Sequence, residues 1–75
     1  MKKEIFPHIT IQPDVRFGKP VIQGTRTPVD LIVGKLAGGM ALDEVMREYE
    51  LQPEQVRAAL GYAAELLAEE TLAFV

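Results

Sequence analysis

A glycine- and proline-rich stretch, RFGKPVIQGTRTPVD at residues 16–30, sets the main limit on what this chain can fold into. Proline lacks a backbone N–H and restricts the residue before it to extended conformations, so no helix can run through Gly18-Lys19-Pro20. Gly24 closes the apolar pair before it, and helical spacing of apolar residues begins only after Pro28. The sequence therefore predicts an extended first part and a helical second part.

Short strands are predicted in the first part of the chain. In HITIQP, residues 8–13, two isoleucines alternate with polar residues at the period of two that is typical of a strand. The segments VRF (15–17) and VIQ (21–23) are candidates for further short extended pieces. We expect a β arm over about residues 8–23, without a partner strand of its own. So short an arm has to pack on the helices or pair with the arm of a second chain.

Three helices are predicted after the arm, over about residues 28–37, 42–49 and 53–70, because apolar residues recur there at spacings of three and four. Thr27 is expected to cap the first helix, with Pro28 at its first position. The third helix is expected to have an apolar seam (Val56, Leu60, Ala63, Leu67) and a solvent-facing side (Glu54, Gly61, Glu65, Glu69). This outline predicts one mainly α domain, residues 1–75, built as a helix-turn-helix type bundle preceded by a short β arm.

Length and composition narrow the possible functions. The chain has 75 residues, one histidine and no cysteine, and 48% of its residues are hydrophobic. We therefore expect a folded chain that holds no metal and no cofactor. A chain so short and so apolar is expected to complete its core as a homodimer or higher homo-oligomer. No apolar run reaches membrane-spanning length and no signal peptide opens the chain, which predicts a cytoplasmic protein with no membrane partner.

No pattern of catalytic residues is found, so we expect that the protein is not an enzyme. A nucleotide-hydrolysing loop has the form GxxxxGK[ST] and leads directly into a helix, whereas Gly18-Lys19 is followed by Pro20, which has no N–H to donate. The threonine hydroxyls have no base and orienting group arranged around them in the sequence. His8 is better interpreted as a strand or surface residue than as a catalytic base.

The charge distribution favours an anionic partner for the first half of the chain. Residues 1–35 carry six basic side chains and three acidic ones, whereas residues 36–75 carry two basic and eight acidic ones. DNA would therefore be met by the first half, with Arg16, Lys19 and Arg26 as candidate phosphate contacts near a helix N-terminus. The alternative is that Thr27 only caps the helix and Arg26 pairs with an acid.

The third helix is a poor reader of DNA bases. Gln55 and Arg57 are the candidates for contacts to base edges, and Glu54 stands beside them. The many alanines of this helix instead suit close packing against another helix, inside the domain or across a dimer. We favour the packing role.

The segments GKPVIQGTRTPV (18–29), GM (39–40) and RAALGYA (57–63) resemble the small prokaryotic domain-of-unknown-function family number 433, over about residues 8–67. Members of that family are often described as VapB-type antitoxins or DNA-binding proteins. The resemblance implies a three-helix, homeodomain-like helix-turn-helix fold preceded by short strands, which is usually dimeric. It also implies a PIN-like toxin as partner, with the family protein acting as antitoxin and as repressor of its own operon.

Three positions depart from the family pattern. Ala41 and Gln52 stand where capping residues are common, and Glu50 stands where proline is common, which predicts weak caps and extra acid around the turn before the third helix. Two functions remain open. The first is a DNA-binding, antitoxin-like regulator, and the second is a dimeric protein-interaction module that does not touch DNA.

Overall fold

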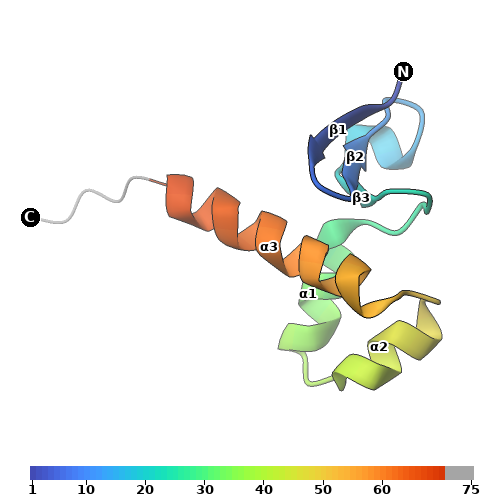
Figure 1. Ribbon diagram of the computed structural model, residues 1–75, viewed down its shortest axis with the longest axis vertical. Coiled ribbons are helices and arrows are strands. Elements are labelled where there is room, and N and C mark those ends of the chain that lie inside the picture. The colour runs from blue at the N-terminus through green and yellow to red at the C-terminus, as the bar shows by residue number, and fades with distance from the viewer. Residues whose placement is uncertain (71–75) are drawn as a thin grey trace, which may run out of the picture.

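The computed structural model describes residues 1–70 and places a small sheet against one end of a group of helices (Figure 1). The elements are β1 (Lys3–Phe6), β2 (Ile9–Ile11), the 3-10 turn η1 (Arg16–Gly18), β3 (Val21–Ile22), α1 (Val29–Ala37), α2 (Leu42–Glu48) and α3 (Pro53–Glu69). Three helices preceded by a short β arm agree with the outline predicted from the sequence. None of the helices in this part of the chain has the length and apolar character that crossing a membrane requires.

The β arm is a three-stranded antiparallel sheet in the order β1-β2-β3. Ile9 at its centre is paired with Phe6 on one side and with Ile22 on the other. The expectation that the arm lacks a partner strand is therefore wrong. The sequence pattern did not reveal β1, because this edge strand has two exposed residues followed by two half-buried ones and so lacks an alternation of period two.

Residues 15–17 form no strand, contrary to our prediction. Val15 is buried, but Arg16, Phe17 and Gly18 follow it with φ values of 52°, 57° and 80°. The left-handed turn is closed by hydrogen bonds from Gly18 N to Val15 O and from Lys19 N to Arg16 O, each 3.1 Å. Only glycine adopts such a backbone at little cost, so two non-glycine residues here store strain. As a result, Phe17 lies fully exposed at the tip of the turn.

The sheet and the helices share one core. Its fully buried side chains come from the sheet and from all three helices: Ile9, Ile22, Ile32, Val45 and Val56. Burial of each such side chain contributes roughly 1.5–3 kcal/mol to stability. The sheet therefore packs on the helices, which is one of the two arrangements expected for the arm.

The start of α1 differs from the prediction that Thr27 caps it. The N-cap is Pro28, and no side chain makes a capping hydrogen bond. The hydroxyl that organises this segment belongs to Thr25, which donates to Ile22 O at 2.7 Å and accepts from Thr27 N at 3.0 Å. Thr25 therefore stabilises the loop before the helix, which leaves Thr27 to contribute through its backbone.

The starts of α2 and α3 compensate for their weak N-cap residues. The carboxylate of Glu44 accepts a hydrogen bond from Ala41 N at 2.9 Å, and the side-chain oxygen of Gln55 accepts one from Gln52 N at 2.7 Å. In a capping box, the side chain of the third helical residue accepts a hydrogen bond from the backbone N–H of the N-cap residue. Glu44 and Gln55 each make this bond. Both helices are therefore stabilised at their starts from within the helix.

The two predicted faces of α3 are only partly correct. Val56 is buried, but Leu60 is 41% exposed and Leu67 is 67% exposed. Gly61, which we assigned to the solvent side, faces Phe6, since a Cβ atom there would lie 3.3 Å from Phe6 Cζ. The unpredicted strand β1 covers this face of the helix. Beyond residue 63 every described residue is exposed, and α3 extends away from the rest of the molecule (Figure 1).

Gly24 is expected to resist substitution because of its backbone alone. Its φ is 82°, and a Cβ atom there would meet nothing within 4 Å. We predict that Gly24→Val lowers the free energy of unfolding by about 1–3 kcal/mol, the cost of a forced left-handed conformation. Gly34 provides a matched control, because it is equally open but lies within α1. Gly34→Ala should raise stability by up to about 1 kcal/mol, whereas Gly24→Ala should lower it. Equal effects of the two alanine variants in urea unfolding would contradict this assignment.

Candidate nucleic-acid interface

Arg16 and Arg26 lie side by side, although ten residues separate them in the sequence. Arg16 Nε donates a hydrogen bond to the carbonyl oxygen of Arg26 at 2.9 Å. Both side chains are exposed, and within residues 1–70 neither forms an ion pair. The alternative in which Arg26 pairs with an acid is therefore not what the described residues show. We call Arg16 and Arg26 the arginine pair, a surface that presents two guanidinium groups, which can bind phosphate oxygens with two donors each.

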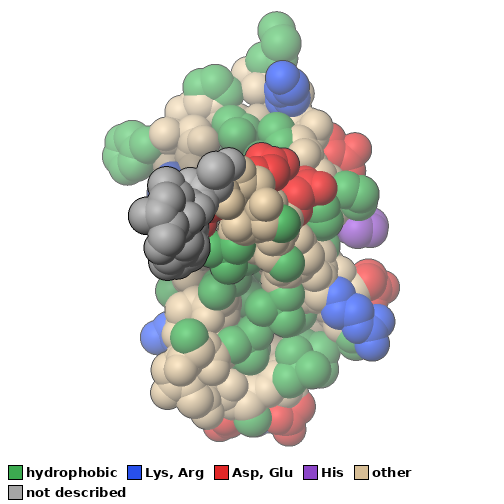
Figure 2. Space-filling model, turned by 90° about the vertical axis from the view of Figure 1, so that its left-hand side faces the viewer, with side chains coloured by type: hydrophobic (Ala, Val, Ile, Leu, Met, Phe, Trp, Pro, Cys, Tyr) green, Lys and Arg blue, Asp and Glu red, His purple; other side chains and the backbone are tan. Residues whose placement is uncertain are grey.

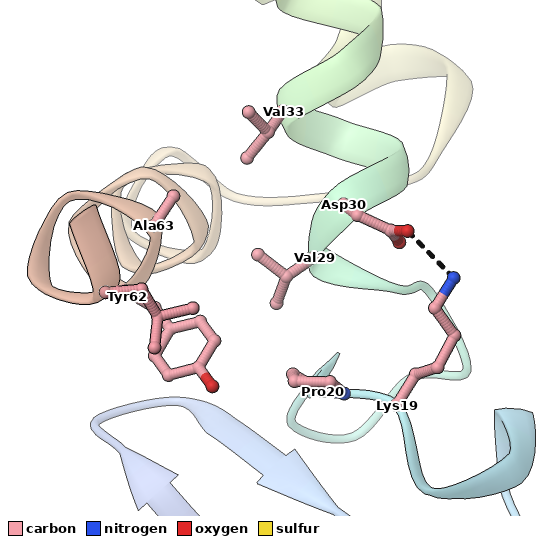
Figure 3. Close-up of a pocket in the computed structure, with 8 residues that line it drawn as sticks. Lys19, Pro20, Val29, Asp30, Val33, Tyr62 and Ala63 are labelled. Carbon is pink, nitrogen blue, oxygen red and sulfur yellow. Dashed lines mark hydrogen bonds and ion pairs between the residues drawn. The ribbon is translucent and has the colours of Figure 1, made fainter. Parts of the chain in front are cut away.

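Lys19 is already partnered. Its Nζ lies 2.8 Å from Asp30 Oδ2 in an exposed ion pair (Figure 3). The hydrogen bond from Lys19 is the main reason why the pKa of Asp30 is lowered, and the backbone N–H groups of Leu31 and Asp30 lower it further. A phosphate would have to compete with Asp30 for Lys19. Of the three basic residues predicted to contact phosphate, Lys19 is thus the one whose charge is already engaged by an acid within residues 1–70.

The N-terminus of α1 is also less available to an anion than the sequence suggested. Pro28 has no N–H, and the N–H of Val29 donates to Pro20 O at 3.0 Å. The carboxylate of Asp30 then lies in the first turn, where it interacts with the positive end of the helix dipole. Phosphate contacts on this surface are therefore expected from side chains, and the arginine pair is the best placed.

The other two predicted DNA contacts belong to α3. Gln55 is half-buried, and its side-chain oxygen is used to cap the helix. Arg57 is exposed and forms no ion pair within the described chain. No hydrogen bond or ion pair in residues 1–70 connects either one to the arginine pair. The five candidate residues thus divide between the loop and α3, and Gln55 has a structural role.

An apolar groove of about 310 Å³ lies between α1, α3 and the segment before β3 (Figure 3). Tyr62 borders it and packs on Phe6 with the ring centroids 5.8 Å apart. The Lys19–Asp30 ion pair lies at its rim, and the other lining residues are Pro20, Val29, Val33, Ala63 and Leu66. A groove of this kind can hold an aliphatic or aromatic side chain.

Two features of this region could not be found by sequence reasoning. The groove combines residues far apart in the chain, and Phe17 is presented to solvent only because of the left-handed turn around it. No cluster of three potential metal ligands occurs in the part of the chain that the structure describes.

The ion pair at the rim yields a test by pH titration. We expect Lys19→Met to raise the pKa of Asp30 toward its ordinary value, because the largest cause of the lowering is removed. Since the folded-state pKa is lowered, the pair stabilises the protein above the unfolded pKa of Asp30 and loses this effect as pH falls through the folded value. Both side chains are more than half exposed, so the effect should stay below about 1 kcal/mol. Carboxyl NMR titration measures the pKa directly. Lys35 lies on α1, as Asp30 does, and Lys35→Met should leave the pKa of Asp30 unchanged. An equal pKa shift in the two variants would contradict the assignment.

Comparison with known proteins identifies the family. The family model described as "Protein of unknown function (DUF433)" matches residues 9–63. The uncharacterized protein y4eO of Sinorhizobium fredii is 34% identical over 56 residues, which cover 73% of this chain and 25% of y4eO. The crystal structure of Rv2018 from Mycobacterium tuberculosis is similar with a TM-score of 0.63 and 31% identity, over 69% of this chain and 24% of Rv2018. The chain thus spans about a quarter of the length of each relative. It belongs to the DUF433 family.

Proposed function

We propose that this protein is a DNA-binding regulator of the antitoxin type, which holds DNA phosphates through the arginine pair and represses its own operon. The observation that carries the proposal is the hydrogen bond from Arg16 to the backbone of Arg26, because it brings two exposed cationic residues to one place. Like charges repel, so an anion placed between them would be favourable. The excess of basic residues in the first half of the chain supports the same surface.

The proposal includes α2, the turn after it and α3 as a helix-turn-helix. Its support is a short connection, residues 49–52, in which Glu50 has a φ of 55°. Base reading from α3 is expected to be weak, because Gln55 caps the helix and Glu54 is next to it. DNA binding by this chain should therefore be dominated by phosphate contacts, with Arg57 as the candidate for one base contact.

The toxin partner rests on the family resemblance alone. A PIN-like toxin is proposed as the protein that this chain would neutralise, and the groove between α1 and α3 offers a place for one of its apolar side chains. The groove also supports the second candidate, a protein-interaction module without DNA binding, because its walls are almost entirely apolar. Both proposals describe a binding protein without catalysis.

DNA binding can be tested by titration against the chain's own promoter DNA at several salt concentrations. Arg26→Ala and Arg16→Ala should each weaken binding similarly for all sequences and flatten the salt slope by about 0.9 per lost phosphate contact. Lys35→Ala is the matched control, since it removes one positive charge from an exposed position of α1, outside the proposed helix-turn-helix. Arg57→Ala should relax sequence preference at one base pair, by about 1–3 kcal/mol.

The outcomes separate the two candidate functions. Absence of salt-dependent binding, for the protein alone and together with the product of the neighbouring gene, would overturn the DNA proposal and leave the interaction module. Binding that Arg26→Ala and Arg16→Ala leave unchanged would show that DNA binds elsewhere on the protein.

A further inference from the structure

The second half of α3 carries apolar side chains that the rest of the described chain leaves exposed. The helix has 17 residues and is about 25 Å long. Every residue from Ala64 to Glu70 is exposed, including Leu66 at 47% and Leu67 at 67%. Helical segments this short are marginal in water unless an apolar face is covered. The projecting half therefore has the character of a helix that packs on another surface.

One face of α3 is exposed along most of the helix. Arg57, Leu60, Ala64 and Leu67 follow one another at spacings of three, four and three, which places them on one line along the helix. All four are exposed, whereas the buried residues Val56, Ala58 and Ala59 lie on other faces. We call these four residues the α3 stripe. Its spacing is that of a seam between two helices, and the small Ala64 at its centre permits close approach.

We propose that the α3 stripe pairs with the α3 stripe of a second copy, with the two helices antiparallel about a two-fold axis near Ala64. Such an interface is self-complementary, as a two-fold axis requires. Leu60 of each copy would be covered by the projecting half of the partner's helix, and the partner's projecting half would in turn be supported. The exposed leucines are thereby buried on both sides of the axis.

The charges of α3 select the antiparallel arrangement over the parallel one. Arg57 is the one basic residue of this helix, and acidic residues gather toward its C-terminal end: Glu65, Glu69 and the following Glu70. In antiparallel pairing, each Arg57 lies toward the partner's acidic end and close to the side chain that flanks the stripe, Glu70. In parallel pairing, the acidic ends of the two helices would meet and repel each other.

The surroundings of the stripe fit the same occupant. Ala63 and Leu66, on the adjoining side of α3, line the apolar groove against α1. Figure 2 shows hydrophobic side chains gathered on the face toward which α3 projects, with acidic side chains near the helix end. The pairing does not rest on the proposed DNA binding, because it uses neither residue of the arginine pair. It does engage Arg57, so the pairing and the base contact proposed above for Arg57 are alternative roles of this side chain, and the dimer tests below are made without DNA.

Cysteine cross-linking without DNA tests the geometry directly, because the chain has no cysteine of its own. Ala64→Cys places one thiol near the proposed axis, and mild oxidation should give a disulfide-linked dimer. Ala68→Cys is the matched control, since Ala68 is equally exposed one turn further along α3. It should stay largely unlinked, because antiparallel pairing separates the two thiols. Efficient linking of both variants would indicate parallel helices and overturn the proposal.

Sedimentation of the full chain at micromolar concentration tests whether the stripe holds the dimer. Leu67→Glu should raise the dimer Kd by about tenfold or more, because it places a charge in an apolar interface. Leu42→Glu makes the same substitution at an exposed leucine of α2 and should leave the dimer intact. Arg57→Glu should weaken the dimer, and Glu70→Arg in the same chain should restore it. A monomeric wild type, or a dimer that Leu67→Glu leaves unchanged, would overturn the proposal whatever the protein does with DNA.

Discussion

A short backbone bridge between Val21 and Pro28 is the contact on which the rest of the structure depends. Ile22 N donates to Thr27 O, and Val29 N donates to Pro20 O, each at 3.0 Å. These bonds fold the segment into a tight loop whose reversal requires the left-handed backbone of Gly24. The loop fixes where α1 leaves the sheet. Because α1 packs on α3, the loop also decides which faces of the helices meet.

The same loop creates the local electrostatics. It brings the carbonyl of Arg26 to Arg16, and it places Asp30 within reach of Lys19. The Arg16–Arg26 contact concentrates positive charge. The Lys19–Asp30 ion pair neutralises the lysine and places a carboxylate in the first turn of α1. The basic residues near this loop therefore differ: the arginine pair is not engaged by an acid within residues 1–70, whereas Lys19 is paired with Asp30 at the rim of the groove.

α3, at 17 residues, is longer than the surface that the rest of the described chain offers it. The sheet and the first two helices bury α3 only as far as Ala63, and every residue of the helix after Ala63 is exposed within residues 1–70. A small core supplies limited stability, and a second copy is an efficient way to bury the remaining apolar surface. The proposed two-fold pair would also double the arginine pair, and two-fold symmetry is what regulators with paired DNA half-sites use.

The sequence alone determined the order and type of the main elements, because the positions of glycine and proline that end helices and strands, and the spacing of apolar residues, are local properties. It also marked the residues of the arginine pair, although not their contact.

Tertiary structure decided the rest. Strand β1 has no alternating pattern and forms only because β2 lies beside it, and Gly61 is covered only because β1 brings Phe6 to it. The side-chain oxygen of Gln55 accepts a hydrogen bond from Gln52 N at the start of α3, a contact that our sequence analysis did not predict. The groove joins Pro20 to Tyr62, and the exposure of Phe17 follows from a strained turn. These features depend on which segments meet in space, and the pattern of a single segment does not carry that information.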